Sequence, residues 1–177
     1  RSAGFNTADI FGLSTATIFM LIFMMFIGGN TFSTAGGIKT STFALICINT
    51  WSIIRGKKKV EVLRRTIPND DMLKAFTVLV TFSAGMLICI YALCITEKHI
   101  LDMPDRGLID LIFEEVSAFS TCGLSTGVTG MLSDSGKVIL AISMFIGRLG
   151  TLSIIFAFSR KIISTNYSYP EEHIMVG

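Results

Sequence analysis

Residues 121–126, Thr-Cys-Gly-Leu-Ser-Thr, match residues 2–7, Ser-Ala-Gly-Phe-Asn-Thr, in their order of small, glycine, apolar and polar side chains, at a spacing of 119 positions. The tetrapeptide Met-Phe-Ile-Gly also occurs twice, at 25–28 and at 144–147, with the same spacing. Two short matches in one register indicate an internal repeat. The repeated unit is a glycine-containing loop followed by an apolar helix, and we expect the chain to begin inside one copy and to contain all of the next.

The composition around these motifs is that of a membrane protein. Of the 177 residues, 51% are hydrophobic and 16% are charged, against roughly 25% charged in soluble domains. Segment 72–95 carries one charge and is longer than the roughly 20 residues that a spanning helix needs. Segment 136–159 is expected to be a second spanning helix, whereas the apolar run 13–27 is too short to cross a bilayer alone. We therefore predict an all-α membrane protein.

The distribution of basic residues predicts the topology. Arginines and lysines gather in segment 55–65, and Arg160 and Lys161 follow the last apolar run. Positively charged loops remain in the cytoplasm. When the apolar segments cross the membrane one after another, both basic clusters lie on the cytoplasmic side. This arrangement predicts a multi-pass protein of the plasma membrane. Since the chain opens at Arg1 without a signal peptide, we expect it to be a fragment of a longer protein.

Segment 106–127 has both ends outside in this topology and is too short to cross twice as helices. We therefore predict a re-entrant hairpin, with a half-helix that enters the membrane and an extended return through the second glycine motif. Non-helical backbone at membrane depth is tolerated only inside protein or along a watery cavity. A pore meets that condition.

The two glycine motifs have the composition of a cation filter. Backbone carbonyls that face a common axis replace the hydration shell of an ion, and Gly4 and Gly123 permit the backbone angles that this requires. Neutral side chains at these positions favour a monovalent cation. The alternative is that each motif is an ordinary turn after a helix.

Segment 28–44 is rich in Gly, Ser and Thr and interrupts the short apolar run before it. Such a composition does not favour a helix, so we expect an intramembrane loop that obstructs the pore and moves aside. A structural kink without a gating role is the alternative. Lys39 would bind carbonyls that the broken helix frees, or would add positive charge to the closed gate. The candidate gating residues are Gly28, Gly29, Gly36, Gly37, Lys39 and Arg148.

Arg148 occupies the position of Gly29 in the repeat register and lies near the middle of the expected last helix. An arginine inside a membrane is a functional candidate by default. It would hold the loop through its carbonyls or form a barrier to cations, whereas pairing with a carboxylate for packing is the alternative. Of Glu114 and Glu115, one would orient the filter loop by hydrogen bonding, although a merely structural role is equally open.

Several of these motifs resemble the Trk/Ktr/HKT superfamily of potassium transporters: Ala3–Thr7, Gly28-Gly29, Ser33–Thr40, Ser117–Gly127 and Met144–Gly150. The tail 169–177 looks most like the KtrB branch. The resemblance covers nearly the whole chain and implies M1-pore-M2 repeats, with re-entrant pore hairpins and a broken lining helix. This chain would then hold the end of the third unit (1–54), a cytoplasmic linker (55–71), the fourth unit (72–163) and a cytoplasmic tail (164–177).

The resemblance also implies how the motifs work. It places ion-facing carbonyls at Ser2, Ala3, Thr121 and Cys122, beside the key glycines Gly4 and Gly123. Ser2 stands where such filters often have Thr. The resemblance further implies a gating loop in the third unit and an arginine in the fourth, at Arg148.

Potassium would be the transported ion, Na⁺ a candidate activator, and no organic cofactor is implied. Expected partners are the lipid bilayer, a second full-length subunit in a homodimer, and a KtrA/TrkA-like cytoplasmic nucleotide-binding ring, but no nucleic acid. A carrier with alternating access also uses broken helices and stays open as a second class. A membrane enzyme is disfavoured, because the sequence shows no nucleophile with a paired base and no HExxH motif.

Overall fold

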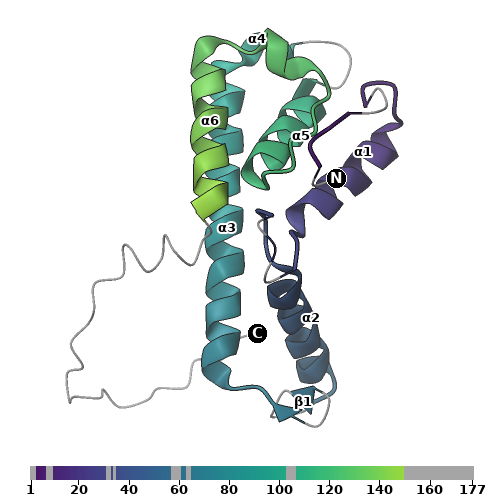
Figure 1. The fold of residues 1–177 in the computed structure, drawn as a ribbon, viewed down its shortest axis with the longest axis vertical. Coiled ribbons are helices and arrows are strands. Elements are labelled where there is room, and N and C mark those ends of the chain that lie inside the picture. Colours follow the sequence, from purple (N-terminus) through teal and green to yellow (C-terminus); the bar gives the residue numbers. More distant parts are fainter. Residues whose placement is uncertain are drawn as a thin grey trace, which may run out of the picture.

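The computed structural model is mostly helical and describes residues 3–6, 10–30, 33, 35–56, 61–62, 65–102 and 107–149 (Figure 1). In chain order its elements are α1 (Thr15–Phe26), α2 (Thr40–Ile54), β1 (Glu61–Val62), β2 (Arg65–Thr66), α3 (Asn69–Thr96), α4 (Lys98–Leu101), α5 (Gly107–Phe119), the 3₁₀ helix η1 (Val128–Met131) and α6 (Asp134–Leu149). The predicted tail 164–177, and the part of the expected last helix after Leu149, lie outside the described residues.

Helix α3 is the longest element and, among the described residues, the one helix long and apolar enough to cross a membrane. It begins at Asn69, three residues before the predicted start, with Asp70 and Asp71 in its first turn. There their charges favour the positive end of the helix dipole. Only 22% of its most apolar stretch is buried, unlike the core helix of a soluble domain. Its exposed apolar surface suits a lipid environment.

The connection between α2 and α3 contains an element that the sequence did not predict. Strands β1 and β2 pair antiparallel, with Glu61 opposite Thr66. Each strand has two residues, which is too short for an alternating pattern to appear in the sequence. Apart from this two-residue pairing the described elements are helical, in agreement with the predicted all-α class.

The short apolar run forms α1, and the chain then leaves the helix for a closed loop. Ile27 and Ile38 form a parallel bridge, and the Gly28 amide donates to the Ile38 carbonyl at 2.7 Å. The loop thus starts and ends at the same place. It ends at Lys39 rather than at residue 44, since α2 already begins at Thr40. The physical reason is that Gly37 is the last glycine of the segment, so nothing beyond Lys39 breaks a helix.

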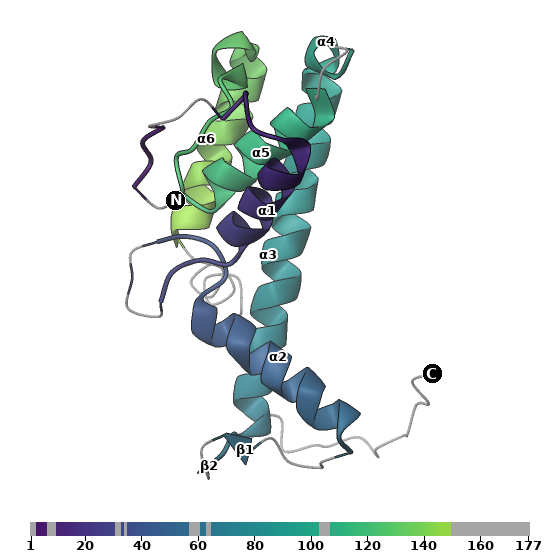
Figure 2. The ribbon, with the colours of Figure 1, turned by 90° about the vertical axis from the view of Figure 1, so that its right-hand side faces the viewer.

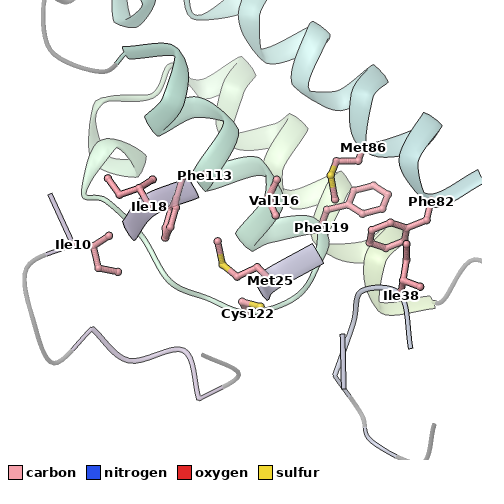
Figure 3. Packing of buried hydrophobic residues seen from close by; sticks show 10 residues of the cluster. All are labelled: Ile10, Ile18, Met25, Ile38, Phe82, Met86, Phe113, Val116, Phe119 and Cys122. Carbon is pink, nitrogen blue, oxygen red and sulfur yellow. The ribbon is translucent and has the colours of Figure 1, made fainter. Parts of the chain in front are cut away.

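Helix α5 lies in the middle of the upper half of the molecule, in contact with α1, α3 and α6 (Figures 1 and 2). Helix α2 packs against the lower half of α3. Figure 3 shows the core that joins these helices, with the α1 side chains Ile18 and Met25 facing Phe113 and Val116 of α5. The edge-to-face ring pair of Phe82 and Phe119, with centroids 4.9 Å apart, ties α3 to α5.

The internal repeat extends to the caps of the two helices that follow the glycine motifs. Ser14 accepts a hydrogen bond from the Thr17 amide before α1, and Ser133 accepts one from the Gly136 amide before α6. These N-caps fix where each helix begins. The helices start at Thr15 and Asp134, which is the spacing of 119 seen in the motifs.

Candidate functional site

The two glycine motifs lie side by side. Gly4 and Gly123 have φ angles of 75° and 83°, in the left-handed region that favours glycine. A Cβ atom at Gly123 would lie 3.0 Å from the Gly4 Cα atom, and one at Gly4 would lie 3.2 Å from the Cys122 carbonyl. The Asn6 amide group donates to the carbonyl of Ser125, its counterpart in the repeat, at 2.5 Å. The structure thus brings the predicted residues Ala3, Gly4, Cys122 and Gly123 together, while Ser2 lies outside the described residues.

Helix α5 delivers the second motif through a capped end. The Thr121 amide donates to the Ala118 carbonyl at 3.0 Å, and the Cys122 amide donates to the Ser117 carbonyl at 2.9 Å. This pair of hydrogen bonds is the Schellman motif, whose turn residue is usually glycine. Here the turn residue is Thr121, with a φ of 52°. A β-branched residue in this region is rare, and no feature of the sequence pointed to it.

Glu114 holds the return segment that follows the second motif. Its carboxylate accepts hydrogen bonds from the Ser125 hydroxyl at 2.6 Å and from the Thr126 amide at 2.9 Å. It also accepts from the hydroxyls of Thr126, at 3.3 Å, and Thr129, at 2.8 Å. The expectation that one of the two glutamates orients the loop is thus met by Glu114. Glu115 is fully buried beside Cys89 of α3.

The glycine-rich loop touches the end of α5 directly. The Gly36 amide donates to the Thr121 hydroxyl oxygen at 2.9 Å. A Cβ atom at Gly36 would lie 2.6 Å from that oxygen and 2.8 Å from the Ser120 carbonyl, so no side chain fits there. Gly28 and Gly37 pack against each other, and Gly37 has a φ of 81°. A Cβ atom at Gly29 would also meet the Ser33 side chain of the same loop. The predicted gating residues Gly28, Gly29, Gly36 and Gly37 are therefore all closely packed.

Lys39 closes this loop on itself. Its ammonium group donates to the Ser33 carbonyl at 2.7 Å and to the Ala35 carbonyl at 2.8 Å. The first of the two roles expected for Lys39, binding backbone carbonyls, agrees with these contacts. The carbonyls belong to the loop itself rather than to the end of α1. A role in gating stays a prediction.

Arg148 shares a cavity with the loop. The cavity has a volume of about 280 Å³ and is lined by Ser33, Ala35, Gly36, Gly37, Lys39, Gly147, Arg148 and Leu149. Gly147 lets α6 approach the end of α5, since a Cβ atom there would overlap the Phe119 carbonyl oxygen. The close approach of α6 to α5 thus brings Arg148 to the loop. The repeat register aligns Arg148 with Gly29 in the sequence, but it does not by itself predict that α6 and the loop lie against each other.

Nearly the whole chain is similar to known cation transport proteins. The family of cation transport proteins named TrkH matches residues 1–169. Ktr system potassium uptake protein D of Bacillus subtilis (strain 168) is 42% identical over all of this chain and 38% of its own length. Ktr system potassium uptake protein B of the same organism is 38% identical over the same shares. The potassium/sodium uptake protein NtpJ of Enterococcus hirae is 36% identical over all of this chain and 39% of its own.

The chain therefore spans about two-fifths of the length of the curated relatives that it matches. These relatives are transporters, which confirms the prediction that the family is not one of enzymes. They also confirm the resemblance on which the filter and loop motifs were interpreted. The chain belongs to the TrkH family of cation transport proteins, within the Trk/Ktr/HKT superfamily, and is similar to its Ktr branch.

Proposed function

We propose that this chain forms part of a gated potassium pathway across the plasma membrane. The stretches around Gly4 and Gly123 would be two strands of one selectivity filter, and the loop 28–39 would obstruct ions on its inner side. Potassium as the ion is supported by relatives that are named as potassium uptake proteins. Since one relative is named for both potassium and sodium, Na⁺ remains a candidate second ion or activator.

The observation that carries this proposal is the contact between the two left-handed glycines. Gly4 and Gly123 lie backbone to backbone at one register of the repeat, as expected of neighbouring strands around a shared axis. Carbonyls of Ser2, Ala3, Thr121 and Cys122 would replace the water of the ion. Helix α5 ends at Phe119, just before this strand, and the negative end of a helix dipole favours a cation there.

The same geometry supports a proposed membrane topology. Helix α5 and its return segment would be a re-entrant pore hairpin, and α1, the loop and α2 would be a broken lining helix. The loop's ends are paired and Lys39 binds two of its carbonyls, those of Ser33 and Ala35; irregular backbone inside a membrane needs such internal partners. Upstream sequence would supply the remaining strands of the filter.

The gate would consist of the loop together with Arg148. The loop contacts the end of α5 that bears the filter strand, and Arg148 lines a cavity together with residues of the loop. A positive guanidinium group at this depth would add an electrostatic barrier to cations while the loop is closed. Movement of the loop away from the end of α5 would open the path.

The partners implied for the full-length protein remain proposals. Two full-length subunits would form a homodimer in the bilayer. A KtrA/TrkA-like nucleotide-binding ring would dock on the cytoplasmic side, where the linker 55–71 and the tail 164–177 are placed by the topology. No nucleic acid is involved in this scheme.

Replacing Gly123 by Ser in the full-length protein tests the filter. The added side chain meets the Gly4 backbone, and a left-handed φ disfavours it. We expect the ratio of K⁺ to Na⁺ uptake to fall. Gly130→Ser is the matched control, because a Cβ atom at Gly130 meets nothing within 4 Å. An unchanged ion ratio in Gly123→Ser would overturn the filter assignment.

A further inference from the structure

A hydrogen bond from the Gly36 amide to the Thr121 hydroxyl joins the loop to the filter strand. Its two partners are 85 positions apart in the sequence. Both are held in place by their own elements. Gly36 sits in a loop whose ends pair at Ile27 and Ile38, and Thr121 sits in the capped end of α5. The contact therefore links the glycine-rich loop to the end of α5, each of which is held by its own hydrogen bonds.

Thr121 has an unfavourable backbone conformation for its residue type. It occupies the turn position of the Schellman motif with a φ of 52°, where glycine is preferred because a side chain is strained. Such strain persists only when surrounding contacts hold it. The two amide hydrogen bonds to Ser117 and Ala118 come from α5 itself, whereas the bond to the Thr121 side chain comes from the loop.

The fit on the loop side is equally specific. No side chain can be added at Gly36 without meeting Thr121 or the Ser120 carbonyl. Lys39 binds the Ala35 carbonyl, so the peptide that carries the Gly36 amide is anchored at its carbonyl end. The Gly36 amide is therefore already oriented toward the Thr121 hydroxyl.

We infer that Thr121 is a positioning residue that couples the loop to the filter strand. In the closed state its hydroxyl accepts the Gly36 amide, which stabilises both the loop position and the left-handed turn. When the loop moves away, the turn loses that support. The coupling is reciprocal, so whatever stabilises the turn also stabilises the closed loop. The inference rests on the proposed function and adds how its two parts communicate.

The first test measures loop closure by thiol accessibility in the full-length protein. Ala35→Cys is introduced as a reporter that lines the cavity of the loop, with the exposed Cys47 replaced by Ser. In this background, Thr121→Val removes the acceptor, Thr121→Ser keeps it, and Thr121→Gly removes it while relieving the backbone strain. The reagent is a membrane-impermeant thiol reagent, applied from the cytoplasmic side.

We expect Val and Gly at position 121 to raise the modification rate about fivefold, the factor that follows from losing one ordinary hydrogen bond. Ser should keep the parent rate. The Gly variant covers the case in which Val fails to fold, because glycine tolerates the turn. Parent rates in both Val and Gly, or a Ser variant as reactive as Val, would overturn the inference.

A second measurement separates this inference from the proposed gate. Potassium flux is compared for Thr121→Val in the intact protein and in a protein whose loop is shortened around Gly36 and Gly37. Coupling predicts that Val raises flux in the intact protein and adds nothing in the shortened one. Equal effects in both would overturn the coupling. A shortened loop that itself leaves flux unchanged would instead count against the gate, whatever the thiol rates show.

Discussion

Glu114 shows how much of the candidate site depends on a single side chain. Its carboxylate accepts four hydrogen bonds, all from the return segment between Ser125 and Thr129. Hydrogen bonds to a charged acceptor are stronger than those between neutral groups. The outer end of the proposed filter is therefore fixed to α5 by one residue, eleven positions before the first of its partners.

Glu114→Gln removes the charge and leaves one acceptor oxygen at nearly the same size. We expect a loss of about 1–3 kcal/mol of stability, seen as a lower melting temperature of the full-length protein, and a lower ratio of K⁺ to Na⁺ uptake. Asp134→Asn is the control, since that carboxylate is exposed and pairs with Lys137 at 4.0 Å, a surface pair of small value. If Glu114→Gln changes neither quantity more than the control does, the anchoring role is wrong.

Among the elements, the loop between α1 and α2 and the end of α6 line a shared cavity. Shortening the loop around Gly36 and Gly37 is expected to raise potassium flux, because we propose that the loop obstructs the pathway. Arg148→Ala should raise the resting leak in the same assay, while Lys137→Ala, an exposed position on the same helix, should not. Unchanged or lower flux from well-folded, shortened protein would contradict the gate.

The elements also show what sequence could predict. Segments 13–27 and 72–95 became α1 and α3 within three residues at each end, because long apolar runs have a strong and local signal. The strands β1 and β2 have two residues each, too few for an alternating pattern. The start of α2 at Thr40 lies in a stretch of hydroxyl residues that suit either a loop or the first turn of a helix. The contact of Gly36 with Thr121 joins distant segments, so no local pattern could reveal it.

In the whole molecule, the two copies of the repeat provide two equivalent segments of the proposed filter. The differences between the copies provide the proposed gate. Gly28 continues into a loop, whereas its counterpart Gly147 packs on the Phe119 carbonyl and continues within α6 to Arg148. The register of 119 positions predicted the pairing of the motifs, and the helix caps extend it. The sequence predicted that Arg148 of the second copy lies at the loop, whereas the contact of Thr121 with the loop was visible only in three dimensions.

The central claim is that Gly4 and Gly123 belong to one filter, and relative ion permeability tests it most directly. Zero-current potentials in potassium and sodium gradients would be measured for the full-length protein, for Gly4→Ser and Gly123→Ser, and for the control Gly130→Ser. We expect both filter variants to lose potassium preference in the same direction and the control to keep it. Wild-type permeability ratios in either Gly4→Ser or Gly123→Ser would contradict the claim.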